Sequence, residues 1–238
     1  SGHSKWNNIK RKKEATDAKR AKVFTKIGRE IAVCVKAGGP DPVSKTALRD
    51  LIAKANSLNL PNYNILRTIN KYSSGGGEDY ESITYEGYGP GGAAVIVETM
   101  TDNRNRTASD MRHYFDKFGG NLGASNCVSW QFDRKGVLLV EREEQDEDEF
   151  MMIALEAGAD DFAAEEESFE IITSEENFET VRDALAAQGI EFADASVQMI
   201  PQNYVSLNEE QLVNMQKLID MLEDNDDVQE IWHNCDNL

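Results

Sequence analysis

The sequence lacks the features that mark membrane, secreted and disulfide-bonded proteins. No run of 18 or more apolar residues occurs in the 238-residue chain, so we expect no membrane span. The basic N-terminus is not followed by an apolar stretch, so we expect no secretory signal. The three cysteines, Cys34, Cys127 and Cys235, are far apart and odd in number. This suits a reducing compartment better than a disulfide framework, and the cytoplasm is the expected location.

The signatures of common catalytic centres are also missing. His3, His113 and His233 lie in separate segments without metal-ligand spacing, and there is no Cys-x-x-Cys pair. No Gly-x-Ser-x-Gly elbow is present. The glycine-rich run 87–92 lacks a following Lys-Ser or Lys-Thr and precedes a strand, so it predicts a turn instead of a phosphate loop. We therefore expect no enzyme, no metal, no cofactor and no small-molecule substrate.

What the sequence does contain is a sharp division of charge. The chain carries a net charge of −18, which on its own argues against a polyanionic partner. Residues 1–75, however, hold 16 Lys and Arg against 5 Asp and Glu, whereas residues 76–238 hold 9 against 38. Such asymmetry indicates a charged partner for the basic part. The acidic part is expected to face away from phosphate or to contact basic proteins, although solubility alone explains it better.

Hydrophobic periodicity predicts three helices in the basic segment. The first begins near Asp17, the second runs from about Ser44 to Pro61, and the third begins at Asn62 as its cap. Residues 73–77 predict a flexible linker. Residues 1–14 are polar and aperiodic, so we expect a mobile or loosely held arm. The prediction is a basic helical domain over residues 1–77, made of a three-helix bundle and this arm.

The acidic remainder has the alternating pattern of an α/β fold. Strands are expected over 83–88, 93–99, 128–132, 137–141, 169–173, 196–200 and 228–233, and helices over 108–118, 146–157, 175–188 and 208–223. The elements from Gly136 onward come close to a ferredoxin-like unit, whereas the last helix and strand have no sheet of their own. We predict an α+β multidomain protein with two ferredoxin-like α/β domains: an acidic domain, 136–201, is inserted in a discontinuous one formed by 78–135 and 202–238.

The arm is the strongest candidate for a nucleic-acid contact. Lys10, Arg11, Lys12 and Lys13 are consecutive cations that repel one another unless a polyanion compensates. Each phosphate that they neutralise releases counterions, which adds affinity without sequence choice. Trp6, beside Lys5, could stack on an unpaired base. The alternative is a solvated terminus with Trp6 packed on the bundle; the cations favour nucleic acid, whereas Trp6 does not decide between the two.

The first helix carries a basic stripe opposite its apolar face. The stripe contains Lys19, Lys22, Lys26, Arg29 and Lys36, and the apolar face contains Phe24, Ile27, Ile31, Cys34 and Val35. Solvated faces usually mix charges of both signs, and only Glu30 interrupts this one. A stripe and an arm of the same sign make a more specific footprint than either alone.

The segment Asp102-Asn103-Arg104-Asn105-Arg106-Thr107 lies at the start of a predicted helix. Arginines there oppose the helix macrodipole, at about 0.3–1 kcal/mol each. Arg104 and Arg106 therefore invite a functional explanation, since guanidinium groups suit phosphate. The alternative is a loop in which Asp102 pairs with an arginine and Thr107 caps the helix. The sequence favours neither.

These motifs resemble the YebC family, described as probable transcriptional regulators with mitochondrial translational-activator relatives. The resemblance rests on residues 2–6, 17–20, 24–26, 85–92, 102–107, 119–123, 222–224 and 227–228, spread over nearly the whole chain. Arg11-Lys12-Lys13-Glu14 replaces what is often a His-Arg-Lys run and keeps its positive charge. The resemblance implies a helical domain and two α/β domains, one inserted in the other. It also implies DNA binding or action on translation at the ribosome, without known catalysis.

The sequence thus predicts a non-catalytic nucleic-acid-binding regulator of gene expression. The favoured form is a DNA-binding transcriptional regulator. The alternative is a translation activator bound to the ribosome or its RNA, and a metal-dependent nuclease or a protein adaptor is less favoured. Ribosomal or transcription proteins are expected as further partners, and no membrane. No helix resembles a recognition helix with a base-reading set, so promoter specificity is not predicted. The predicted nucleic-acid contacts are Lys5, Trp6, Lys10, Arg11, Lys12, Lys13, Lys19, Lys22, Lys26, Arg29, Arg104 and Arg106.

Overall fold

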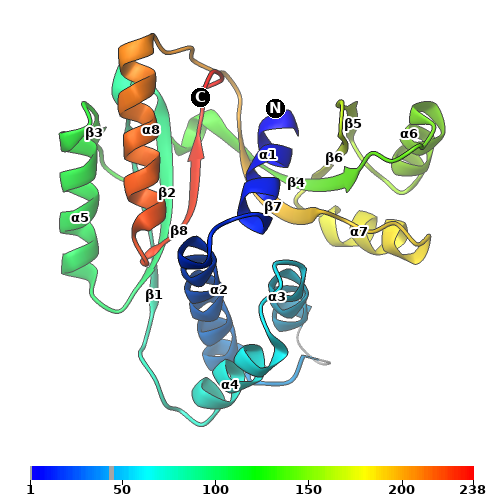
Figure 1. Ribbon diagram of the computed structural model, residues 1–238, viewed down its shortest axis with the longest axis horizontal. Helices are drawn as coiled ribbons and strands as arrows, with labels where there is room; N and C mark the ends of the chain where they lie inside the picture. The colour runs from blue at the N-terminus through cyan, green and yellow to red at the C-terminus, as the bar shows by residue number, and fades with distance from the viewer. Residues whose placement is uncertain (1, 43–45) are drawn as a thin grey trace. The chain divides into compact units, whose positions relative to one another are not determined.

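The computed structural model describes residues 2–42 and 46–238 and divides the chain into two units (Figure 1). The smaller unit contains the residues up to Glu14 together with Phe132–Gln202, and the larger contains Ala15–Gln131 and Asn203–Leu238. The described residues form eight α-helices and two four-stranded antiparallel sheets, which confirms a mixed α and β protein. None of these helices is long and apolar enough to cross a membrane. The three-domain boundaries, the three-helix bundle and the nesting of one domain in another stay predictions.

Three helices of the larger unit share one apolar core. They are α2 (Asp17–Gly38), α3 (Thr46–Ser57) and α4 (Asn62–Ser73). Ile31 and Leu48 are fully buried in this core, and Ile65 and Ile69 of α4 pack with them. The predicted start of the second helix at Ser44 lies outside the described residues. Asn62 is the first residue of α4, not its cap, because Pro61 occupies the cap position and no side chain caps the helix.

The larger unit also contains a sheet with two helices packed on it. The elements are β1 (Glu81–Tyr88), the short 3-10 helix η1 (Pro90–Gly92), β2 (Ala94–Thr101), α5 (Arg104–Lys117), β3 (Asn121–Leu122), the 3-10 helix η2 (Ser129–Gln131), α8 (Glu209–Asp224) and β8 (Val228–His233). The strand order is β3-β1-β2-β8, so the C-terminal strand pairs with β2, Val97 facing Ile231. Helices α5 and α8 lie side by side (Figure 1), and Phe115 and Leu218 join Val97 in the core.

The sheet of the smaller unit is built from a β-α-β-β-α-β sequence of elements. They are β4 (Phe132–Glu141), α6 (Glu147–Glu156), β5 (Asp161–Ala164), β6 (Ser168–Ser174), α7 (Phe178–Ala187) and β7 (Asp194–Pro201). Its strand order is β5-β6-β4-β7. Phe169 and Ile171 of β6 are fully buried against Phe150 of α6 and Leu185 of α7. Adjacent side chains of a strand point to opposite faces, so Glu170 faces away from these helices.

The N-terminal segment is helical, so the prediction of a mobile or loosely held arm was wrong. Helix α1 (Gly2–Lys13) belongs to the smaller unit. The side chain of Trp6 is 8% exposed, and its indole N–H donates a hydrogen bond of 3.1 Å to Glu167. Lys5 lies 2.7 Å from the Oε1 atom of Glu170. These contacts join residues more than 160 positions apart, and local periodicity carries no signal for them.

The predicted strand over 128–132 was wrong, and a buried carboxylate explains why. Residues 129–131 form η2 instead. Glu86, 6% exposed, accepts hydrogen bonds from the backbone N–H groups of Asn126 (2.6 Å), Val128 (3.2 Å) and Ser129 (2.7 Å). Burial alone would raise the pKa of Glu86, but these bonds outweigh it and hold the pKa below its ordinary value. The amides are therefore bound to a side chain and cannot join a strand ladder.

Glu86→Gln is expected to lower the free energy of unfolding of the larger unit by about 2 kcal/mol, because an amide NH₂ replaces one acceptor beside three N–H donors. Urea denaturation measures the loss, and hydrogen exchange at Asn126, Val128 and Ser129 locates it. The matched control is Glu81→Gln on the same strand, where the carboxylate is exposed. Equal stability of the two variants would contradict this role for Glu86.

Candidate nucleic-acid interface

Two lysines of the basic stripe are bound to the C-terminal end of α8. Lys22 donates a hydrogen bond of 2.8 Å to the carbonyl of Asp224, and Lys26 donates one of 2.6 Å to the carbonyl of Glu223. Lys22 also lies 3.5 Å from carboxylate oxygens of Asp224 and Asp226. The last carbonyls of a helix have no partner within it and carry the negative end of its dipole. These lysines therefore satisfy the end of α8 within the larger unit.

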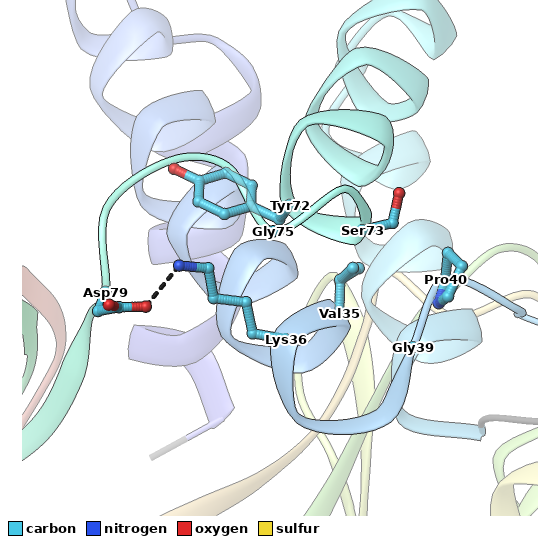
Figure 2. Close-up of a pocket in the computed structure, with 8 residues that line it drawn as sticks. All are labelled: Val35, Lys36, Gly39, Pro40, Tyr72, Ser73, Gly75 and Asp79. Carbon is cyan, nitrogen blue, oxygen red and sulfur yellow. Dashed lines mark hydrogen bonds and ion pairs between the residues drawn. The ribbon is translucent and has the colours of Figure 1, made fainter.

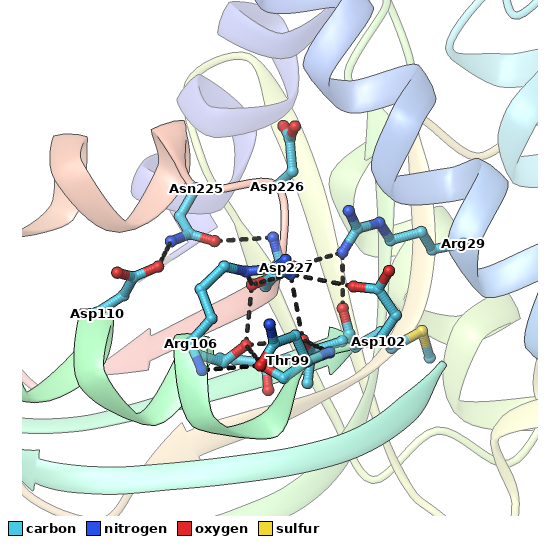
Figure 3. A network of polar contacts seen from close by, with 12 residues as sticks. Arg29, Thr99, Asp102, Arg106, Asp110, Asn225, Asp226 and Asp227 are labelled. Carbon is cyan, nitrogen blue, oxygen red and sulfur yellow. Dashed lines mark hydrogen bonds and ion pairs between the residues drawn. The ribbon is translucent and has the colours of Figure 1, made fainter. Parts of the chain in front are cut away.

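Arg29, the next residue of the stripe, binds the buried carboxylate of Asp227 (Figure 3). Its Nη1 atom lies 2.7 Å from Asp227 Oδ1 and 2.9 Å from the carbonyl of Met100. Its guanidinium also lies 4.8 Å from the centre of the Tyr80 ring. The side chain of Arg29 is 15% exposed and that of Asp227 is 4% exposed. This ion pair fixes α2 to the turn between α8 and β8.

Asp227 also receives hydrogen bonds from the start of α5. Arg106 Nη2 lies 2.8 Å from its Oδ1 and 3.0 Å from its Oδ2, and the Thr107 hydroxyl donates at 2.9 Å (Figure 3). The backbone N–H of Asp227 donates to Asn225 at 2.8 Å. One carboxylate thus joins α2, α5 and the α8–β8 turn. A carboxylate with this many donors is held in one position.

The electrostatics of this network favour the charged form of Asp227. Burial alone would raise its pKa, but hydrogen bonds from Arg29, Thr107 and Arg106 outweigh burial and hold the pKa below its ordinary value. The hydrogen bond to Asp227 in turn raises the pKa of Arg106. Two guanidinium groups thus share one buried anion, and removing that anion would leave them without compensation.

In the segment Asp102–Thr107, both arginines pair with carboxylates, as the structural alternative expected for one of them. Arg106 also lies 3.1 Å from Asp102, the pairing expected of a structural loop. The cap of α5 is Asn103, which accepts from the N–H of Arg106, so the prediction that Thr107 caps the helix was wrong. Arg104 is 66% exposed and lies 3.3 Å from Glu81. Arg106 is committed to Asp227, whereas Arg104 forms an exposed pair that water and salt screen.

The cations of α1 fall into two groups. Lys5 is bound to Glu170 of β6 and Trp6 to Glu167 of the β5–β6 turn, and Lys10 lies 3.8 Å from Glu167. Lys12 and Lys13 are exposed and make no polar contact with any described residue. Arg11 is exposed and bonds only to Asn8, at 2.8 Å, among these residues. Lys19, on α2, is exposed and likewise lacks a partner in the described part of the chain.

A shallow cleft of about 560 Å³ lies beside Lys36, the last cation of the stripe (Figure 2). Lys36 points toward Asp79, 2.5 Å from its carboxylate, and donates to the carbonyl of Glu78 at 2.9 Å. Tyr72, on another wall, has a raised pKa, mainly because it is buried. The charge of Lys36 is therefore already compensated by Asp79.

Among residues 2–42 and 46–238, no group of three or more His, Cys, Asp or Glu side chains is placed to hold a metal.

Sequence reasoning cited residues 222–224 and 227–228 for the family resemblance and did not foresee that Asp227 binds the cations of α2 and α5. Glu223, Asp224, Asp226 and Asp227 cluster at the C-terminal end of a helix, where negative charge opposes the macrodipole. This is the same signal that singled out Arg104 and Arg106 at a helix start. Applied to the acidic residues as well, it would have indicated that cations from elsewhere bind this turn.

Family models match almost the entire chain. The model for the TACO1/YebC protein N-terminal domain covers residues 4–75, and the model for the TACO1/YebC second and third domain covers residues 80–235. The chain is 56% identical to a protein of Acetivibrio thermocellus, over 98% of each, and 55% identical to one of Clostridium beijerinckii, over 99% of this chain and 97% of the relative. Both relatives carry the name "Probable transcriptional regulatory protein".

A solved structure shows the same fold. The crystal structure of a conserved hypothetical protein from Aquifex aeolicus matches with a TM-score of 0.83 at 43% sequence identity. The match covers 92% of this chain and 91% of the other.

Asp227→Asn is expected to destabilise the larger unit by about 3–5 kcal/mol, because Arg29 and Arg106 lose the buried charge that compensates them. Urea denaturation measures this. The control is Asp226→Asn, which removes a neighbouring exposed carboxylate 3.5 Å from Lys22 and should change stability by about 1 kcal/mol or less. A loss for Asp227→Asn no larger than that of the control would contradict the assignment.

The contribution of Asp227 should also depend on pH. Its pKa is lowered in the folded state, so its stabilisation is fully present above the ordinary Asp pKa of about 3.9 and is lost as the pH falls through the lower folded value. The difference in unfolding free energy between wild type and Asp227→Asn should therefore be constant above about pH 5 and shrink below about pH 4. Glu86 is present in both proteins and cancels. A difference that grew on acidification would refute this sign.

Proposed function

The chain belongs to the TACO1/YebC family, and we propose that it is a non-catalytic, nucleic-acid-binding regulator of gene expression that acts on DNA. The observation that carries the proposal is the run Arg11-Lys12-Lys13 at the end of α1. These three cations are exposed, and none pairs with a carboxylate of the described chain. Cations that are exposed and have no carboxylate partner in the described chain are available to the phosphates of another molecule.

The position of these cations at a helix C-terminus explains only part of the run. A cation in the last turn is stabilised by the macrodipole, by about 0.3–1 kcal/mol. Four consecutive cations, Lys10 to Lys13, also repel one another, and only Lys10 has an acidic partner, at 3.8 Å. Stability therefore does not account for the other three, whereas a polyanion does.

The structure narrows the set of residues proposed to contact nucleic acid. Lys22, Lys26 and Arg29 are occupied by the α8–β8 turn, as is Arg106, and Lys5 and Trp6 by carboxylates of the smaller unit. The proposal therefore rests on Arg11, Lys12 and Lys13, with Lys10, Lys19 and Arg104 as exposed additions. All of these can contact phosphate without reading bases.

The second candidate is the RNA of the translation machinery. The face of α2 opposite its core is covered by the α8–β8 turn, so it cannot enter the major groove of duplex DNA as a recognition helix does. Phosphate contacts alone remain, and structured RNA offers these as readily as DNA. Regulation of translation at the ribosome is therefore the alternative function to test alongside regulation of transcription.

The double variant Lys12→Gln/Lys13→Gln is expected to bind duplex DNA and structured RNA more weakly than wild type. The slope of log K against log salt concentration should become less steep by about 1 for each lysine that contacts a phosphate. Fluorescence anisotropy over a salt series measures both quantities. The control is Lys217→Gln, an exposed lysine on the acidic helix α8, which should bind like wild type.

An unchanged affinity and slope for the double variant with both probes would exclude this interface. Tight binding to protein partners that persists in nuclease-treated extract, without any binding to either probe, would instead identify the chain as a protein adaptor.

A further inference from the structure

The outer face of α4 carries large side chains that the core does not use. The inner face buries Ile65, Ile69 and Tyr72 with α2 and α3. On the outer face, Tyr63 is 72% exposed and Leu66 is 59% exposed. Side chains three or four positions apart on a helix are neighbours, so these two form one surface and are not scattered singly. Their exposure therefore needs an explanation outside the fold.

Tyr63 is already held in an orientation that suits stacking. The guanidinium of Arg67, one turn further along α4, lies 5.6 Å from the centre of the Tyr63 ring. A cation at this distance from an aromatic ring is attracted by its π electrons, by about 0.5–1 kcal/mol at an exposed site, which favours this orientation of the ring. A ring that is 72% exposed still offers most of its surface. The pair thus combines an exposed aromatic ring with an adjacent positive charge.

The charge around this face is positive, in contrast to most of the chain. The segment from Leu51 to Gly77 contains no Asp or Glu, although the chain as a whole holds 43 of them. Its cations on α4 are Arg67 and Lys71, both exposed. In a chain with so many carboxylates, an ordinary solvated helix face would be expected to include some. Lys71 lies 3.6 Å from Glu78, so Arg67 is the cation of α4 that this surface offers to an anion.

The N-terminal turn of α4 adds a second attraction for anions. No side chain caps this helix, and its first turn contains no acidic residue. The N–H groups of Asn64 and Ile65 donate to the carbonyl of Pro61, so those of Asn62 and Tyr63 are the ones left at the positive end of the helix dipole. Tyr63 lies in this same turn. An anion bound there would therefore lie close to the aromatic ring.

We propose that the α4 face, defined here as Tyr63, Leu66, Arg67 and Asn70, binds an unpaired nucleotide of a single-stranded nucleic acid. The base stacks on Tyr63 beside Leu66, and the phosphate is bound by Arg67 and the open N-terminus of α4. Asn70 is exposed on the same face and supplies both a donor and an acceptor for the sugar or base. The inference rests on the proposed function and specifies it: α1 supplies phosphate contacts of any geometry, whereas the α4 face requires a base that is not stacked in a duplex.

A protein partner would use this face differently. Docking of an apolar protein surface requires Leu66 and the body of the Tyr63 ring, but it gains little from the exposed guanidinium of Arg67 or from the lack of Asp and Glu over residues 51–77. Single-stranded nucleic acid uses the aromatic ring, the guanidinium and the positive surround together. The combination of all three is why we favour nucleic acid.

The test compares Tyr63→Ala with Tyr63→Phe, which keeps the ring and removes only the hydroxyl. The probes are oligouridylate, oligothymidylate and a mixed-sequence DNA duplex, with affinity measured by fluorescence anisotropy at several salt concentrations. Tyr63→Ala should weaken binding to the single strands at least about 5-fold, because stacking on an aromatic ring contributes at this level or more. Tyr63→Phe should stay within about 2-fold of wild type, and duplex binding should be the same for all three. The salt slope should not change for Tyr63→Ala, since stacking releases no counterions.

A second variant tests the cation. Arg67→Gln should weaken single-strand binding and also reduce the salt slope by about 1. The two oligonucleotide probes show whether the face prefers ribose or deoxyribose. All these side chains are exposed, so the variants should unfold at the same temperature as wild type, which thermal denaturation checks.

The outcomes separate this inference from the proposed function. If Tyr63→Ala binds single strands like wild type while Lys12→Gln/Lys13→Gln binds more weakly, the α4 site is refuted and the proposed function stands. If wild type binds none of the three probes, both fail. If oligonucleotide binding is unaffected by Tyr63→Ala but a protein partner is lost from nuclease-treated extract, the α4 face is a protein-docking surface and the inference is overturned.

Discussion

The larger unit depends on one buried anion, the carboxylate of Asp227. It compensates Arg29 from α2 and Arg106 from α5, and it accepts a further bond from Thr107. Lys22 and Lys26 bind the carbonyls just before it in the chain. This single turn therefore determines how the helices next to it are held. It also determines which cations of the basic segment are occupied within the protein and which are left for another molecule.

Local patterns predicted the elements of the fold, whereas partners distant in sequence decided what the charged residues do. The apolar face of α2 was correct, because Ile27, Ile31 and Val35 repeat with the helical period and are buried. The stripe opposite was also a real feature, but its partner lies 198 residues away at Asp227, and no periodicity reports such a distance. The alternating residues 128–132 predicted a strand. The pattern carries no sign that Glu86, more than 40 residues earlier, accepts hydrogen bonds from the backbone N–H groups of Val128 and Ser129. The strands β3 and β5 were missed because two and four residues are too few to form a pattern.

Internal partners leave fewer cations for the candidate interface than charge alone indicated, and exposure adds Tyr63 to it. Charge alone could not separate Arg29, which is half-buried and paired with the buried Asp227, from Lys12 and Lys13, which are exposed. Arg29 differs from the two lysines in its exposure and in its acidic partner. The proposed nucleic-acid contact therefore rests on the exposed cations at the end of α1. Burial also revealed Tyr63, since an aromatic residue in an amphipathic helix is expected in the core and this one is 72% exposed. The sequence placed α4 correctly but could not show which of its large side chains the core leaves out.

The central claim is that the cations of the basic segment divide into those bound within the protein and those available to nucleic acid. Lysine acetylation followed by mass spectrometry, with and without duplex DNA or structured RNA, tests it residue by residue. The account predicts that Lys12 and Lys13 react quickly in the free protein and are protected when nucleic acid is added. Lys22 and Lys26 should react slowly in both states, because their amines are bonded to the end of α8. Fast reaction of Lys22 and Lys26 in the free protein, with protection by nucleic acid there and not at Lys12 and Lys13, would contradict it.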